Sequence, residues 1–258
     1  MIDRIKEIID YRELLKNLTV KELKLKYKNS VLGFFWSFLN PLLMLVIYTF
    51  AFKFVLKIQI ENFSVFLLAG MLPWTFFQVS IMGSTNSLVN NAGLIKKVYF
   101  PREIMPLSLI FSNFVNFLIT FIILFAALFV FKIKVGFSIL LLPIILLLLL
   151  LITIGLSLIL SALNVVYRDV SHFVEIIFMA WFYATPVVYS FELVPDKIKP
   201  LILLNPMTLV VQSVRDVVIY NKIPPAEYLL RMLITGIILI AIGYFVFSKI
   251  EKSIAESI

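Results

Sequence analysis

The chain has 258 residues, of which 62% are hydrophobic and 15% charged, and its mean hydropathy is +1.04. A soluble domain is about 45–50% apolar and about 25% charged, so this composition excludes a water-soluble globular protein, a disordered chain and a coiled coil. The sequence therefore predicts an all-α integral membrane protein. At about 20 residues per crossing, six transmembrane helices fit the length and twelve do not.

The formal net charge is +8, from 23 Lys and Arg against 15 Asp and Glu. In a chain this apolar, the excess fits the Lys and Arg that gather on the cytoplasmic side of membrane proteins, and we expect no nucleic-acid partner. Cysteine is absent and His172 is the one histidine, which excludes disulfides and multi-histidine metal centres. We expect no metal site and no cofactor bound by this chain itself.

Residues 1–28 mix charges with apolar side chains at roughly helical spacing, which indicates an N-terminal amphipathic helix in the cytoplasmic interface. A solvated basic leader that only sets topology is the alternative. No cleavable signal peptide is recognisable, so the first apolar run is expected to remain as a span. Charge-free runs predict six spans, near residues 31–56, 65–86, 105–131, 137–163, 173–190 and 229–249.

Orientation follows from counting Lys and Arg on each side of the membrane. With both termini on one side, that side carries 14 of them and the other side 9, together the 23 of the chain. The side richer in Lys and Arg is normally cytoplasmic. We therefore expect both termini in the cytoplasm.

Two further segments lie between the spans. The cytoplasmic link 86–103, NSLVNNAGLIKKVYFPRE, is longer than a bare connector and suits either a short projecting helix or a basic loop. The external stretch 186–225 holds six of the eleven prolines around apolar pieces too short to span. These pieces suit short re-entrant helices at a pore mouth, or a loop that lies in the lipid surface.

The sequence argues against catalysis by this chain. It contains no G-x-x-x-x-G-K-[ST] phosphate-binding loop, and its acidic residues do not cluster within a span. The ionisable patch RDVSHFVE, from Arg168 to Glu175, suits a turn at the membrane surface or an acid–base pair. Ionisable side chains are absent from the centres of the spans, which argues against an ion-coupled carrier. A membrane transferase or phosphatase and a passive channel remain as readings from other classes.

With catalysis and ion coupling disfavoured, the sequence fits a neutral, aromatic-rich passage that depends on an energy source outside this chain. Trp and Tyr within spans are informative because their polar tips need partners. A flat ring with a polar edge suits the C–H faces of sugars, whereas the convergent polar groups of a narrow-specificity site are not apparent. The candidate channel residues are Trp36, Tyr48, Trp74, Trp181, Tyr183 and Tyr189. An interfacial aromatic belt also explains Trp36 and Tyr189.

Four motifs, in order along the chain, resemble those of the ABC-2-type export permeases. They are LTVKELKLKYKNSVLGFFWSFLNPLL at 18–43, IKKVYFPREIMPL at 95–107, NVVYRDV at 164–170 and LNPMTLVVQSVRD at 204–216. The family pattern K/R-Y-x-x-S-x-L-G-x-x-W-x-x-x-x-P is matched by Lys26, Tyr27, Ser30, Leu32, Gly33, Trp36 and Pro41. The resemblance is strongest to the membrane subunit of O-antigen and teichoic-acid polysaccharide exporters.

The resemblance implies a homodimer paired with two copies of a separate ABC ATPase, which binds the ATP and Mg²⁺. It also implies one ABC-2 transmembrane domain over 1–258. That domain comprises a cytoplasmic interface segment 1–30, spans one to five over 31–190, an external re-entrant gate segment 191–228, and the sixth span with a cytoplasmic tail over 229–258. The implied ATPase-coupling residues are Leu94, Ile95, Lys96, Lys97, Tyr99, Phe100, Arg102, Glu103, Arg168 and Asp169.

The implied substrate is a polysaccharide on a polyprenyl-diphosphate carrier, exported across the cytoplasmic (inner) membrane of a bacterium. The expected path is an aromatic-lined channel at the homodimer interface. The basic residues expected near the lipid diphosphate are Arg4, Lys24, Lys26 and Lys28. Because the wider exporter superfamily shares these motifs, a small hydrophobic drug or a lipid is the alternative cargo.

Overall fold

The computed structural model describes residues 2–28, 30–57 and 59–257, and within these ranges the side chains of residues 6–250. The described chain is helical and contains no strand, as the composition predicts. The longer helices are α1 (Ile2–Asp10), α2 (Arg12–Tyr27), α3 (Trp36–Tyr48), α4 (Phe63–Asn90), α6 (Ile104–Val130), α7 (Leu142–Val166), α8 (Val170–Ala184), α10 (Pro206–Val218) and α11 (Ala226–Ser257). The short elements are η1 (Gly33–Phe35), η2 (Thr49–Val55), α5 (Ala92–Ile95), η3 (Phe137–Leu141), η4 (Phe191–Leu193) and α9 (Lys199–Ile202).

Five helical segments of the described chain are long and apolar enough to cross a bilayer. They are Gly33–Val55, Phe63–Asn90, Ile104–Val130, Phe137–Val166 and Ala226–Ile250, and each coincides with a predicted span. They make the chain a multi-pass membrane protein.

The remaining predicted span, 173–190, is not a helix of that length. It corresponds to α8, whose 15 residues extend about 22 Å, less than the roughly 30 Å of a hydrocarbon core. The helix ends at Ala184 because Thr185 is extended (φ −109°, ψ 132°), the conformation that a following proline, here Pro186, favours. The count of six spans is therefore not confirmed.

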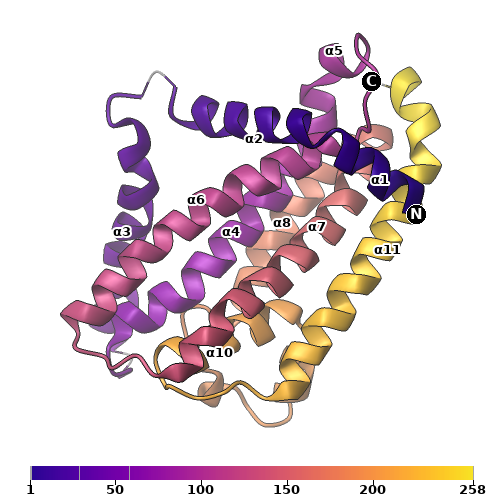
Figure 1. The fold of residues 1–258 in the computed structure, drawn as a ribbon. Helices are drawn as coiled ribbons and strands as arrows, with labels where there is room; N and C mark the ends of the chain where they lie inside the picture. The colour runs from indigo at the N-terminus through magenta and orange to yellow at the C-terminus, as the bar shows by residue number, and fades with distance from the viewer. Residues whose placement is uncertain (1, 29, 58, 258) are drawn as a thin grey trace.

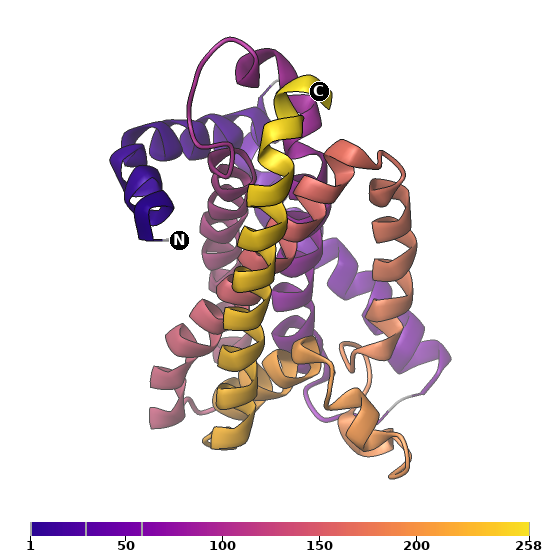
Figure 2. The same ribbon diagram turned by 90° about the vertical axis from the view of Figure 1, so that its right-hand side faces the viewer.

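The N-terminal segment forms two helices where one was expected, with the break at Tyr11 between α1 and α2. Figure 1 shows α2 lying across one end of the bundle, where it packs on α6 and buries Leu18. The termini of the described chain, α5 and α2 gather at that end, and α10 lies at the other (Figures 1 and 2).

Two helices differ sharply in how far the bundle covers them. The central helix α4 packs against α6, α7, α8 and α10, and 78% of its most apolar window is buried. In contrast, none of the equivalent window of the first span, Gly33–Val55, is buried. Figure 1 shows α3 beside the bundle, joined to it through α2 and through the segment that leads into α4.

The closest helix packing joins α7 and α11. Gly155 of α7 lies against the backbone of Leu239 and Ile240, and a Cβ added at Gly155 would lie 2.6 Å from those atoms. Gly243 of α11 lies similarly close to the carbonyl oxygen of Gly155. Small residues at such a crossing let two helices approach closely in lipid, where no hydrophobic effect drives them together.

We predict that Gly155→Ala forces α7 and α11 apart. Overpacking of this kind costs about 2 kcal/mol, so the melting temperature of the purified protein in detergent should fall by about 6 °C. The control is Gly93→Ala, since no atom lies within 4 Å of the added Cβ at Gly93. Equal melting temperatures for the two variants would contradict the packing described for Gly155.

Candidate functional site

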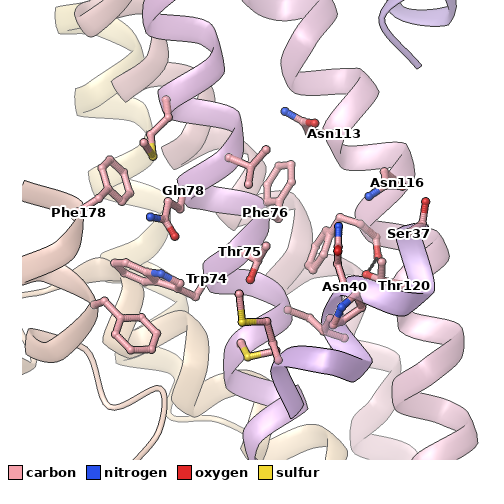
Figure 3. A pocket seen from close by; sticks show the side chains of 18 of the residues that line it. Ser37, Asn40, Trp74, Thr75, Phe76, Gln78, Asn113, Asn116, Thr120 and Phe178 are labelled. Atoms are coloured by element: carbon pink, nitrogen blue, oxygen red, sulfur yellow. Dashed lines mark hydrogen bonds between the residues drawn. The ribbon is translucent and has the colours of Figure 1, made fainter. Parts of the chain in front are cut away.

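A cavity of about 890 Å³ opens between the end of α2 and helices α3, α4, α6 and α8 (Figure 3). Its volume lies within the range of small-molecule binding sites. Helix α4, otherwise mostly buried, contributes a stripe of more exposed side chains at Thr75, Gln78, Val79 and Met82. The spacing of three, four and seven residues places these side chains on one face of the helix. The core helix of the bundle is therefore open to this cavity along one face.

Uncharged polar side chains converge on the cavity from three helices. Helix α3 provides Ser37 and Asn40, α4 provides Thr75 and Gln78, and α6 provides Asn113, Asn116 and Thr120. Figure 3 shows the residues of α3 and α6 grouped on one side of α4, and Gln78 on the side of Trp74 and Phe178. The expectation that convergent polar groups are lacking is therefore wrong. They come from three helices that lie far apart in the sequence.

The end of α2 closes one side of the cavity through two adjacent residues. The hydroxyl of Tyr27 hydrogen-bonds Ser37 of α3 and Asn116 of α6, joining three helices at one point. The Lys26 Nζ donates to Asn113 Oδ1 over 3.3 Å. Burial lowers the pKa of Lys26 from its usual value, because it disfavours the charged form. Of the described residues that line the cavity, Lys26 and Glu175 are the charged ones.

Aromatic rings form the wall of the cavity towards α8. The ring of Trp74 lies 5.6 Å from that of Phe182 and 5.9 Å from that of Phe178. Tyr48 of α3 approaches the same wall, with its ring 6.0 Å from that of Phe182. Contacts of this geometry fix the rings against one another. The wall is therefore a packed surface.

Four of the six predicted channel residues line the cavity, namely Trp36, Tyr48, Trp74 and Tyr183. Trp181 does not, and its indole Nε1 donates to Asn205 Oδ1 over 2.9 Å. Tyr189 also lies outside the lining, and its hydroxyl donates to the carbonyl oxygen of Tyr183 over 2.9 Å. The role of all six in transport stays a prediction.

Two residues of the 204–216 motif attach both ends of α10 to the chain that follows α8. Asn205 caps α10 by accepting from the Met207 N–H, and its Nδ2 donates to Thr185 Oγ1 over 2.8 Å. Near the other end of α10, the fully buried Arg215 donates to the carbonyl oxygens of Pro186 and Val187, each over 2.6 Å.

The surroundings of Arg215 accommodate its guanidinium closely. Arg215 Nε also donates to the Phe66 carbonyl oxygen over 3.4 Å, and the guanidinium carbon lies 3.5 Å from the Phe66 ring centroid. Gly70 leaves room for the group, because a Cβ there would lie 2.8 Å from Arg215 Nη2. Burial lowers the pKa of Arg215 to about 9, so the guanidinium remains charged at neutral pH. Arg215 thus joins α10, α4 and the 186–187 backbone.

The predicted coupling residues divide into a buried set and an exposed set. The side chains of Ile95, Phe100 and Glu103 are buried. Lys96, Lys97, Tyr99, Arg168 and Asp169 are exposed at the end that carries α2, whereas Leu94 and Arg102 are partly buried.

The link 86–103, for which the sequence suited either a short projecting helix or a basic loop, contains only short helical pieces. Helix α4 continues to Asn90, and α5 comprises only four residues. Next to it, Asn164 Nδ2 donates to Asn86 Oδ1 of α4 over 3.2 Å, and Asn164 Oδ1 accepts from the Ser171 N–H at the start of α8. In the patch RDVSHFVE, Arg168 and Asp169 form a turn and the residues from Val170 onward begin α8, with Glu175 exposed to the cavity.

The predicted lipid-diphosphate residues also separate. Lys26 lines the cavity, whereas Lys24 and Lys28 lie in a shallow depression on α2. The side chain of Arg4 lies outside the described residues. Within the described part of the chain, no three His, Cys, Asp or Glu residues are grouped so that they could hold a metal ion.

These features define a membrane permease: a multi-pass helical bundle with a polar and aromatic cavity and a basic surface at one end. Residues 13–219 match the model of the ABC-2 type transporter family, and the chain belongs to that family. Members of this family are the membrane subunits of ABC transporters, and the ATPase is a separate subunit.

Three relatives match the chain almost from end to end. Two O-antigen export system permease proteins RfbA from Klebsiella pneumoniae are 39% and 38% identical to it over 245 residues, which is 95% of this chain and 94% of each relative. An O-antigen export system permease protein RfbA from Myxococcus xanthus is 33% identical over 260 residues, with both chains covered completely.

We predict that Arg215→Met severely destabilises the fold. The substitution removes the donors to three backbone carbonyl oxygens in a buried site, at a cost of about 3 kcal/mol or more. The yield of folded protein in membranes and its melting temperature would both fall. The control, Arg231→Met, removes an exposed ion pair with Glu227 and should be nearly neutral. An Arg215→Met protein as stable as the control would contradict the anchoring role.

Proposed function

We propose that this chain is the membrane subunit of an ATP-driven exporter that moves a polyprenyl-diphosphate-linked polysaccharide across the bacterial cytoplasmic membrane. It would act as a homodimer with two copies of an ABC ATPase, which supply the ATP and Mg²⁺ chemistry. The observation that carries the proposal is the end-to-end match to O-antigen export permeases. A cavity with both aromatic and uncharged polar walls supports it, because sugars present C–H faces and hydroxyl edges.

The connections of the link 86–103 suggest how ATPase motion reaches the cavity. The link joins α4 to α6, and both helices line the cavity. ATP binding closes the two ATPase subunits, whose motion displaces the exposed face around Lys96, Lys97 and Tyr99. The buried side chains of Ile95 and Phe100 hold the link to the bundle, so the displacement shifts α4 and α6. The glycan then passes over the aromatic rings towards the dimer interface.

We infer that the end of the bundle that carries α1, α2 and α5 faces the cytoplasm. The basic residues of α2 lie there, and Lys and Arg favour the cytoplasmic side. On this orientation Lys26 is placed at the cytoplasmic side of the cavity, where its ammonium attracts the diphosphate of the lipid carrier. Helix α10 then lies towards the outer side, where it would contribute to the gate segment.

Export of a small hydrophobic drug or a lipid is the second candidate. The observation that favours it is the set of apolar, adaptable side chains in the cavity wall, which includes Met44, Met71, Met82 and Met179. Methionine adapts to ligands of irregular shape. Such a cargo has no need of the polar edges of Trp and Tyr.

The variants Trp36→Leu and Tyr183→Leu test whether the exposed rings of the cavity guide the glycan. Both residues line the cavity and are substantially exposed, so the fold should tolerate leucine. We expect each variant to reduce surface polysaccharide about tenfold in cells that lack their own copy of the chain. Tyr220→Leu, an exposed residue outside the cavity, is the control. Undiminished polysaccharide in both cavity variants would contradict a role of the two rings in glycan passage, whereas a wild-type chain that restores no polysaccharide would favour the hydrophobic cargo.

We also predict that the double variant Lys96→Glu and Lys97→Glu loses the ATPase subunit. Reversing two exposed charges at a docking surface introduces repulsion, so co-purification of the ATPase should fall at least tenfold. The matched control is Lys132→Glu with Lys134→Glu, two exposed lysines in the loop between α6 and η3. Retention of the ATPase by the Lys96 and Lys97 variant would contradict the coupling assignment.

A further inference from the structure

The polar side chains of the cavity follow the helical repeat on α3, α4 and α6. They occur at positions 37 and 40, at 75 and 78, and at 113, 116 and 120, so each helix turns a polar stripe to the same space. All three helices are candidate spans. Polar groups at membrane depth are costly unless protein or water satisfies them. Three converging stripes therefore indicate a space that water or a polar ligand fills.

Several of these groups retain unused hydrogen-bonding capacity. Asn113 and Asn116 each use the side-chain oxygen to accept from α2, which leaves their NH₂ groups available. The Thr120 hydroxyl donates to the Phe117 carbonyl oxygen. The side chains of Asn40, Thr75 and Gln78 make no hydrogen bond within the described residues, and all three line the cavity.

The types of group define the chemistry of a ligand. A carboxamide both donates and accepts, as does a hydroxyl, so each can pair with a sugar hydroxyl in either direction. Seven uncharged polar residues against one lysine and one glutamate favour an uncharged ligand rich in hydroxyls. Because the pairing works in either direction, such a site tolerates both axial and equatorial hydroxyls. Successive sugars of different configuration can then occupy it in turn.

We propose that the cavity between α3, α4 and α6 is a sugar-binding subsite in which Asn40, Thr75 and Gln78 hydrogen-bond the hydroxyls of an uncharged glycosyl unit. The ring of that unit lies against the partly exposed ring of Phe182, which Trp74 and Phe178 support from behind. The subsite rests on the proposed polysaccharide export and specifies which sugars it serves. In this proposal, the sugar is recognised within one protomer. The polar side chains that bind it are not among the six Trp and Tyr residues predicted to line the channel.

The experiment compares Asn40→Leu and Gln78→Leu with Gln212→Leu. Gln212→Leu is the control, because it makes the same change of side chain on α10, outside the cavity. The Nε2 of Gln212 is buried without a partner among the described residues. The variants are purified with the ATPase in lipid nanodiscs. The probe is the cells' own neutral polysaccharide, released from its carrier by mild acid. The measurement is the ATPase rate at increasing polysaccharide concentration.

We expect the polysaccharide concentration for half-maximal stimulation to rise about fivefold to tenfold in each cavity variant, the effect of losing one neutral hydrogen bond. Gln212→Leu should match the wild type. The near-isosteric Thr75→Val gives a second measurement if a leucine variant does not reach the membrane, with an expected rise of twofold to fivefold.

Two negative results are distinguishable. Wild-type complex that neither responds to the polysaccharide nor restores it at the cell surface overturns the proposed function. Wild-type complex that responds, with the same half-maximal concentration for Asn40→Leu, Gln78→Leu and Thr75→Val, overturns the subsite and leaves export standing. An equal rise of the half-maximal polysaccharide concentration in Gln212→Leu also overturns the subsite, because the weaker response would then not arise from the cavity.

Discussion

The arrangement of the end of the bundle that carries α10 depends on one buried charge. Arg215 has no exposed surface, and its guanidinium is held by the backbone oxygens of Phe66, Pro186 and Val187. Burying a charge is costly unless its hydrogen bonds are met, so these three segments must lie where they do. The chain that leaves α8 is thereby fixed to α4. Because α8 carries Phe178 and Phe182, the position of the aromatic wall follows from the same constraint.

The cavity combines two environments because α4 presents different faces to different neighbours. Its buried faces pack on α6, α7 and α10, while the stripe through Thr75 and Gln78 remains open. On one side of that stripe lie the rings of α8, and on the other the amides of α3 and α6 (Figure 3). A polar ligand with apolar faces can contact both sides at once, whereas a purely apolar ligand leaves the polar side unsatisfied.

The sequence allowed the spans and the family to be predicted because hydropathy and motif order are local properties. It could not predict that Asn40, Gln78 and Asn116 converge, since residues from three separate helices meet only after packing. A usable signal was present, in the form of uncharged polar residues three or four positions apart within apolar spans. Trp181 shows the opposite case: its indole was expected to line the channel, and it donates to Asn205, a partner that the N-terminus of α10 supplies. The early end of α8 was likewise obscured, because apolar residues continue past Pro186.

The unequal burial of the helices has a mechanical consequence. The first span contributes no buried residues from its apolar window, whereas α4, α6, α7 and α11 form a connected core. Displacing α3 sideways separates few packed surfaces, and its link to α2 and α6 is concentrated in the hydroxyl of Tyr27. Moving the wall of the cavity formed by α3 therefore disturbs less packing than moving α4 or α6. Under the proposed function, the width of the cavity can change with the size of the cargo while the rest of the bundle keeps its packing.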